Sequence, residues 1–263
     1  MSAAKNGYSE KEMMSVVFAR DLQDGEMVMS GAHTEISFGS IMLAQKTHAP
    51  NLIADLAANC FWCNMSDRDA EIYASSSDFR NVRFAEARFD HPDIFYYLKY
   101  VDKFFVGGIQ VDKYGNTNLL GIGSNPKHLK FRGPGSVGIA DIGVIVKNVY
   151  IFVRRHDLRT LVDRVDYISY QGFLDGPGAR ERLGLRGNGP KWLVTPLAVF
   201  DFHPTTKQAR LFKLMPGVKV DAIRERTGFK FEVRPDLAEV PPPTPEELRI
   251  LRAADKQGLL RQG

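Results

Sequence analysis

The chain has 263 residues, of which 44% are hydrophobic, and its 35 lysines and arginines against 31 aspartates and glutamates give a formal net charge of +4. This length allows one large domain or two small ones with a sizeable buried core. The basic residues are spread out, with the densest group at Arg180, Arg182 and Arg186, so the basic stripe with interleaved aromatic residues that is typical of nucleic-acid binding is missing. We expect no nucleic-acid partner, whereas an acidic substrate or a phosphorylated cofactor suits this charge.

The first residues and the most apolar tract favour a cytoplasmic protein. Residues 1–7 lead into charged residues without the apolar segment of a signal peptide. The apolar tract 139–153 is interrupted by Asp141, Lys147 and Asn148, so it falls short of the roughly 18 residues of a membrane span. We therefore expect a cytoplasmic location and no membrane partner.

The two cysteines, Cys60 and Cys63, form an isolated C-x-x-C pattern. A zinc site would need two further ligands at a recognisable spacing, and the sequence offers none. We expect small buried thiols and no bound metal, with a redox pair as the alternative.

The first part of the sequence predicts β-α-β order. Ser9-Glu10-Lys11-Glu12 is a capping-box pattern that begins a helix over residues 9–24. A short strand around Val28, a polar turn at 33–35, a helix over 37–46 and a strand over 52–57 come next. This order predicts a parallel sheet with right-handed crossovers, and hence an open, mostly parallel α/β sheet flanked by helices.

The rest of the sequence predicts strands and helices separated by loops. In chain order these are a polar surface excursion over 66–92, a short helix over 94–101, strands over 104–106, 142–146 and 149–153, strands over 193–201 and 209–214 about a turn at 203–206, a helix over 220–226, and a strand over 229–233. His156 is assigned to a solvated turn. Because residues 241–245 are a proline-rich linker before a helix over 246–256, we expect an α/β domain over 1–240 and an appended segment over 241–263.

One buried strand is followed directly by a polar loop. The apolar run Phe104 to Val106 precedes two glycines that allow a close backbone approach or a positive φ. Ligands of open α/β sheets bind at the carboxyl ends of strands, so this loop is the first candidate site, with an ordinary hairpin as the alternative. Its members of interest are Gly107, Gly108, Gln110, Asp112, Asn116 and Asn118.

A second loop contains a literal G-x-G-x-x-G pattern. Its residues of interest are Gly133, Gly135, Ser136 and Gly138. Pro134 is unusual in a dinucleotide fingerprint, and residues 142–146 resemble a strand more than the helix that such a fingerprint needs. Backbone N–H groups of a glycine-rich turn can still hold a phosphate, a carboxylate or a developing oxyanion.

Three loops together resemble the β subunit of the class I CoA-transferases, and most closely the glutaconate CoA-transferase subgroup. They are Gly107 to Asn118, the segment Asp175 to Leu185, and Pro216-Gly217-Val218 with Thr227-Gly228-Phe229. The resemblance implies an α-type partner subunit in a heterodimer or heterotetramer, a coenzyme A thioester as substrate, no permanently bound cofactor, and an active site at the subunit interface.

The family's nucleophile is a glutamate on the strand after an Ala-Pro element, which here is Ala49-Pro50. A gapless register places Ala57 at that position, and alanine cannot carry the acyl and CoA groups of a ping-pong transfer. Three hypotheses follow. The chain could serve hydrolysis or C–C cleavage, as glutamate-less relatives do; Asp55, which shares a strand face with Ala57 about 7 Å away, could replace the glutamate; or the subunit could be catalytically silent.

The turn after the first strand carries His33 and Glu35, where the family usually has small residues. They could act as general acid and base, or they could lie in an ordinary solvent-facing turn. Arg180 and Arg182 could pair with a substrate carboxylate or the CoA phosphates, or form salt bridges to Glu181 or Asp175. Gln110, Asp112, Asn116 and Asn118 are expected to shape their loop and position an acyl-CoA.

Overall fold

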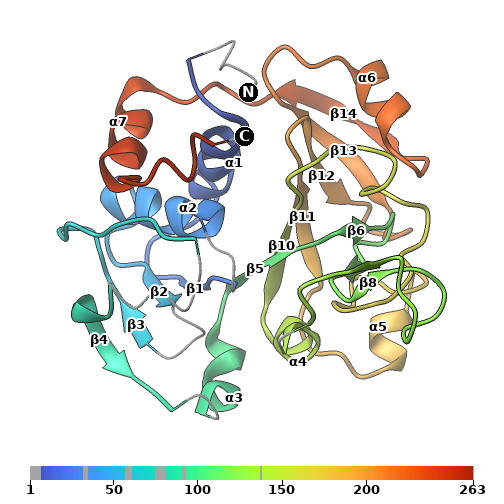
Figure 1. The fold of residues 1–263 in the computed structure, drawn as a ribbon, viewed down its shortest axis with the longest axis horizontal. Helices are drawn as coiled ribbons and strands as arrows, with labels where there is room; N and C mark the ends of the chain where they lie inside the picture. The colour runs from blue at the N-terminus through green and yellow to red at the C-terminus, as the bar shows by residue number, and fades with distance from the viewer. Residues whose placement is uncertain are drawn as a thin grey trace. The chain divides into compact units, whose positions relative to one another are not determined.

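The structure is a computed structural model that describes residues 7–31, 35–56, 61–74, 81–90, 93–136 and 138–262. The chain forms two compact units, one of Met1–Phe105 with Pro241–Gly263 and one of Val106–Val240. The first unit is therefore discontinuous in the sequence, and α1 and α7 from opposite ends of the chain both belong to it (Figure 1). The predicted division into 1–240 and 241–263 stays a prediction.

The first unit contains a mixed sheet with parallel strands beside β1. Strand β1 (Met27–Met29) pairs in parallel with both β2 (Ile53–Leu56) and β5 (Lys103–Gly107). Strands β3 (Phe61–Cys63) and β4 (Ala85–Arg88) continue the sheet beyond β2 in antiparallel fashion. The predicted β-α-β start is confirmed.

Three helices pack together in the first unit: α1 (Glu10–Ala19), α2 (Glu35–Lys46) and α7 (Pro245–Ala254) (Figure 1). Helix α1 begins at the predicted capping box, in which Ser9 and Glu12 bond each other's backbone N–H. Thr244 and Glu247 form a second capping box at the start of α7. A short helix α3 (Ile94–Tyr97) and 3-10 turns at Val82–Phe84 and Leu98–Tyr100 complete the unit.

The second unit contains five neighbouring strands of the sheet and three short helices (Figure 1). Its strands are neighbours in the order β10 (Asn148–Phe152), β11 (Pro190–Val194), β12 (Ala198–Phe202), β13 (Ala209–Leu214) and β14 (Glu232–Glu239). The outer pairs β10–β11 and β13–β14 are parallel. The helices are α4 (Ile139–Ile145), α5 (Ala179–Arg182) and α6 (Val220–Arg226), the last with the predicted bounds.

Two short antiparallel pairs carry the polar loops of the second unit. They are β6 (Gln110–Val111) with β7 (Thr117–Asn118), and β8 (Gly121–Ile122) with β9 (Phe131–Arg132). Together with the parallel pairs of both units, they give the α/β fold that was expected.

The strand predicted over 142–146 is wrong, because these residues belong mostly to helix α4. Its β-branched residues suggested a strand, but the buried positions Ile139, Ile142 and Gly143 follow helical spacing. Gly138 precedes the helix with a φ of 77°. A side chain at Gly143 would overlap the ring of Tyr170, so glycine lets the helix pack closely against that ring.

Three further predictions need correction. The single strand over 193–201 is two strands, because the Thr195 hydroxyl accepts from the N–H groups of Leu197 and Ala198 and closes a turn. The strand over 229–233 begins later and continues to Glu239, with a register shift in its pairing to β13. The segment 66–92 is only partly on the surface, since it contributes strand β4 and the buried Tyr73.

Candidate functional site

The loop after β5 is held by Asp112 and Asn116. The Asp112 carboxylate accepts hydrogen bonds from the N–H groups of Tyr114 and Asn116, at 2.9 and 3.1 Å, and from the Asn116 side chain at 3.0 Å. Asn116 also bonds the backbone of Gly172 and Leu174. Burial raises the pKa of Asp112, and these bonds oppose the shift. The pair ties two loops of the second unit together.

Gln110 and Asn118 form a second buried pair in the same loop. The Asn118 amide donates to Gln110 Oε1 and to the Gly121 carbonyl, both at 2.7 Å, and accepts from the N–H of Leu120. Gln110 Oε1 also accepts from the N–H of Asp166 at 3.0 Å. All four polar side chains of the loop are thus used inside the unit, which confirms that they shape it. Their contact with an acyl-CoA stays a prediction.

The two glycines that open this loop allow a close packing of backbone and side chains. A Cβ on Gly108 would lie 2.7 Å from Thr117 Cγ2, which is closer than carbon atoms pack. Gly107 would lie an ordinary 3.6 Å from the ring of Phe152. Of the two explanations that the sequence left open, close approach therefore applies at Gly108.

The second glycine-rich loop uses two of its N–H groups internally. Gly133 donates to the Leu120 carbonyl at 2.8 Å and Gly135 donates to the Leu119 carbonyl at 3.0 Å. Both amides are thus bonded within the loop in this structure, and their service to an oxyanion stays a prediction. For Ser136 and Gly138 it stays a prediction too.

Arg180 and Arg182 have different surroundings although both are on α5. Arg180 is 4% exposed and donates to the carbonyls of Gln171, Gly172 and Gly187 at 2.8 to 3.0 Å. Burial lowers the pKa of its guanidinium. Arg182 is exposed and forms the predicted salt bridge to Asp175 at 3.1 Å. Arg180 therefore anchors the loop backbone, and the predicted salt bridge at that residue is wrong.

Glu35 lies at the start of α2 in the first unit. It is 4% exposed, and its Oε1 lies 3.4 Å from Lys11 Nζ on α1. Lys11 also donates to the Leu259 carbonyl at 3.0 Å. A solvent-facing turn is therefore wrong for Glu35, whereas its role as acid or base stays a prediction. His33 and Ala57 lie outside the described residues.

Asp55 lies in the middle of the sheet of the first unit and is 0% exposed. Neither carboxyl oxygen has a hydrogen bond in the part of the chain that the structure describes. Burial raises the pKa of Asp55 well above its usual value. The Tyr97 hydroxyl opposes this shift in part. Burial therefore favours the protonated form of the Asp55 carboxyl.

His156, which the sequence assigned to a solvated turn, is buried. Its Nδ1 lies 2.8 Å from Thr195 Oγ1 and its Nε2 lies 3.0 Å from Thr227 Oγ1. Thr227 donates its proton to the Ile223 carbonyl, so we assign the imidazole proton to Nε2. Burial lowers the pKa of His156 to about 4. The isolated histidine gave no signal of this role, because both partners are distant in the sequence.

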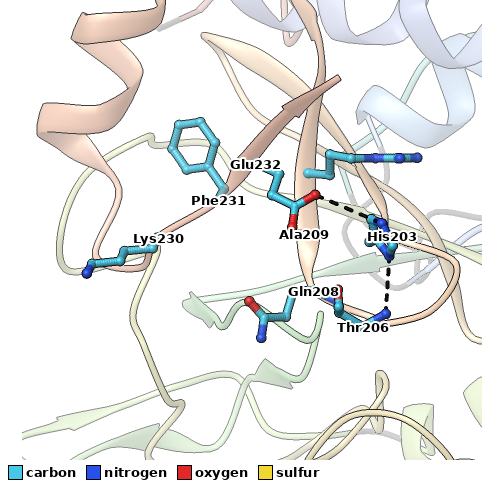
Figure 2. Close-up of a pocket in the computed structure, with 8 residues that line it drawn as sticks. His203, Thr206, Gln208, Ala209, Lys230, Phe231 and Glu232 are labelled. Carbon is cyan, nitrogen blue, oxygen red and sulfur yellow. Dashed lines mark hydrogen bonds and ion pairs between the residues drawn. The ribbon is translucent and has the colours of Figure 1, made fainter. Parts of the chain in front are cut away.

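A cavity of about 160 Å³ lies between β13, β14 and the turn before β13 (Figure 2). His203 Nδ1 accepts from the N–H groups of Thr205 and Thr206, and its Nε2 faces Glu232 Oε2 at 4.0 Å. These contacts close the predicted turn at 203–206. None of the residues predicted for the site lines this cavity, so we assign it no chemistry.

Cys63 is a buried free thiol, as expected, and burial raises its pKa to about 12. Cys60 lies outside the described residues. Among the residues that the structure describes, no three His, Cys, Asp or Glu side chains are grouped so as to hold a metal ion. Nor is any described helix long and apolar enough to cross a membrane.

The parallel strands followed by polar loops define an α/β protein of the kind that binds ligands at strand ends. The chain belongs to the coenzyme A transferase family, whose model matches residues 11–226. This confirms the family resemblance seen in the three loops.

Two CoA-transferase subunits match over most of their length. One subunit of the glutaconate CoA-transferase from Acidaminococcus fermentans is 30% identical over 253 residues, which cover 93% of this chain and 91% of that protein. One subunit of the 3-oxoadipate CoA-transferase from Pseudomonas knackmussii is 29% identical, with 98% and 97% covered. The cholesterol ring-cleaving hydrolase IpdB subunit of Mycobacterium tuberculosis is 26% identical, with 92% of each covered.

Solved structures show the same fold. Glutaconate coenzyme A-transferase from Acidaminococcus fermentans superposes with a TM-score of 0.84 at 27% identity, with 98% of each chain covered. The decarboxylase AibA/AibB superposes with a TM-score of 0.81 at 26% identity, with 97% of this chain and 98% of that chain covered. The fold thus recurs in proteins named as a coenzyme A-transferase and as a decarboxylase.

Proposed function

We propose that this chain is the β-type subunit of a heteromeric enzyme that acts on a coenzyme A thioester by hydrolysis or C–C bond cleavage. The observation that carries the proposal is the state of Asp55. It is the described acid that the sequence offers in place of the family's glutamate, and it is fully buried with a pKa raised by that burial. Covalent transfer needs an ionised carboxylate that attacks the thioester carbonyl. Burial raises the pKa of the Asp55 carboxyl well above its usual value and so opposes that ionised form.

The relatives support a non-transfer reaction on this fold. The IpdB subunit is named as part of a ring-cleaving hydrolase, and AibA/AibB is named as a decarboxylase. Both names also refer to subunits, which supports an α-type partner for this chain. We propose Glu35 as the general base of this subunit, because it is a buried acid that begins α2, the helix that follows β1 in the chain, and ligands of α/β sheets bind where such strands end.

Transfer and cleavage are separated by incubating the reconstituted complex with an acyl-CoA in the absence of an acceptor acid. Cleavage releases products with no acceptor and leaves no CoA on the protein. Hydroxylamine or borohydride followed by mass spectrometry detects a glutamyl or aspartyl CoA adduct. An adduct on any acid of this chain would overturn the proposal.

CoA transfer is the second candidate, because two relatives that cover over nine-tenths of the chain are named CoA-transferase subunits. It predicts that turnover requires a carboxylic acid acceptor and that the adduct forms. The same incubation, repeated with acetate and with glutarate as acceptors, therefore decides between the two candidates.

A further inference from the structure

Three buried polar atoms without hydrogen bonds lie on one face of the sheet in the first unit. Asp55 on β2 and Trp62 on β3 are directly opposite in antiparallel register, so their side chains share a face and begin about 5 Å apart. Both carboxyl oxygens of Asp55 and the indole Nε1 of Trp62 are buried, and none has a hydrogen-bond partner among the described residues.

Aromatic rings form the surroundings of these atoms. The ring of Trp62 packs against Phe89 at 4.6 Å and against Tyr97 at 5.2 Å between centroids, and Phe89 and Tyr97 are 5.0 Å apart. Burial and the Tyr97 hydroxyl are the two influences on the pKa of Asp55, and no lysine, arginine or histidine of the described residues contributes. The three polar atoms of Asp55 and Trp62 therefore lie in surroundings that are otherwise apolar.

The chemistry of the three atoms defines what would satisfy them. Burial favours the protonated form of the Asp55 carboxyl, and in that form the carboxyl offers one donor, as the indole does. An oxygen with two lone pairs can accept from both. Buried polar groups in folded proteins are almost always hydrogen-bonded. A carboxylate is a poor fit, because a charge buried among aromatic rings without a cation carries a large desolvation cost. An uncharged keto or hydroxyl oxygen fits.

We infer that Asp55 and Trp62 recognise an uncharged keto or hydroxyl oxygen on the acyl group of the substrate, with the rings of Phe89 and Tyr97 around its apolar part. Asp55 lies one residue before the end of β2, at the strand edge where ligands of α/β sheets bind. The inference rests on the proposed function and assigns Asp55 to substrate specificity instead of bond cleavage.

Binding can be tested without turnover. The chain has two tryptophans, so Trp192→Phe leaves Trp62 as its single tryptophan fluorophore. The variant is studied as the full chain. We expect cyclohexanone to cause a saturable shift of its Trp62 fluorescence emission. Cyclohexanecarboxylate should cause none. Adding Asp55→Leu should weaken cyclohexanone binding at least tenfold, whereas Met29→Leu, an apolar change beside Asp55 on β1, should leave it unchanged.

Asp55→Asn is the second variant, because its amide keeps one donor and one acceptor in the same shape. It should bind cyclohexanone within tenfold of the parent, which separates hydrogen bonding from a general loss of structure. If the Trp62 emission of all variants changed equally and without saturation, cyclohexanone would not bind at Asp55 and Trp62, and the inference would be overturned.

Specificity is then measured with the reconstituted complex. The ratio of kcat/KM for 5-oxohexanoyl-CoA over hexanoyl-CoA should be at least ten in the wild type and near one in Asp55→Leu, with Met29→Leu keeping the wild-type ratio. An unchanged ratio in Asp55→Leu would overturn the inference. If the wild type acts on neither thioester, the proposed function fails, and the cyclohexanone titration still decides whether the site exists.

Discussion

Glu35 Oε1 at the start of α2 lies 3.4 Å from Lys11 Nζ on α1, and both residues belong to the first unit. The helix N-terminus and the ammonium both attract the carboxylate, so two features of the fold hold it in one place. A buried carboxylate that is held in one place can act as a general base, and this one also links two helices. These two roles lead to different results on mutation.

If Glu35 is the base, Glu35→Gln should lower turnover at least tenfold and leave acyl-CoA binding intact, because the amide keeps the shape but cannot accept a proton. The matched control is Glu12→Gln, which changes a buried acid that pairs with Arg252 at 2.7 Å. That control should lose stability but not turnover per folded molecule. Equal turnover of wild type and Glu35→Gln would remove Glu35 from the mechanism.

Asp55 should make the protein less stable as the pH rises. The unfolded chain releases this proton near the ordinary pKa of 3.8, while the folded chain keeps it to a much higher pH. The free energy of unfolding therefore falls as the pH rises from the pKa of Asp55 in the unfolded chain to its higher pKa in the folded chain, by at most about 1.4 kcal/mol per pH unit. Relative to Asp55→Asn, wild type should be less stable at pH 8 than at pH 5 in urea unfolding. The exposed Asp24→Asn should show no such change.

His156 should make the protein less stable as the pH falls. Its pKa falls from 6.5 to about 4 in the folded chain, so the unfolded chain binds the proton first as the pH is lowered. The neutral imidazole contributes its full share to the free energy of unfolding above pH 6.5. That contribution is lost as the pH falls to about 4, and the loss is up to about 3 kcal/mol. His156→Gln should abolish this slope, and the exposed His128→Gln should keep it. A wild-type slope in His156→Gln would contradict the burial of the imidazole.

Arg180 and Arg182 should differ strongly in their effect on stability. Arg180→Met leaves the carbonyls of Gln171, Gly172 and Gly187 without their donor and should cost about 3 kcal/mol. Arg182→Met removes only an exposed ion pair and should cost about 0.5 kcal/mol or less. Urea unfolding of both variants checks this order. Similar losses would mean that the two side chains share one environment.

The sequence predicted those parts of the fold that depend on local patterns. Both the capping box at Ser9 and the helix over Val220–Arg226 are set by residues within a few positions of one another. Helix α4 was missed because its β-branched residues favour a strand locally. The helix instead depends on a distant contact, the close packing of Gly143 on Tyr170, which lies 27 positions away.

The candidate site was predictable in its loops but not in its contacts. The polar loop after β5 could be found because glycines and amides follow an apolar run. What the sequence could not show is that Gln110 and Asn118 bond each other, or that Arg180 faces carbonyls instead of solvent. The burial of His156 and Asp55 depends on strands and helices that meet only in the folded chain.

The way α7 completes the first unit affects how the protein is made. Ser9 donates to the Leu260 carbonyl and Arg20 to Glu247, so residues that follow the second unit in the chain contact the first helix. During synthesis, the inserted segment Val106–Val240 has all its residues before the first unit does. The surface of α1 and α2 that α7 covers therefore stays exposed in the nascent chain until residues 245–254 have been made, which makes that surface prone to aggregation during synthesis.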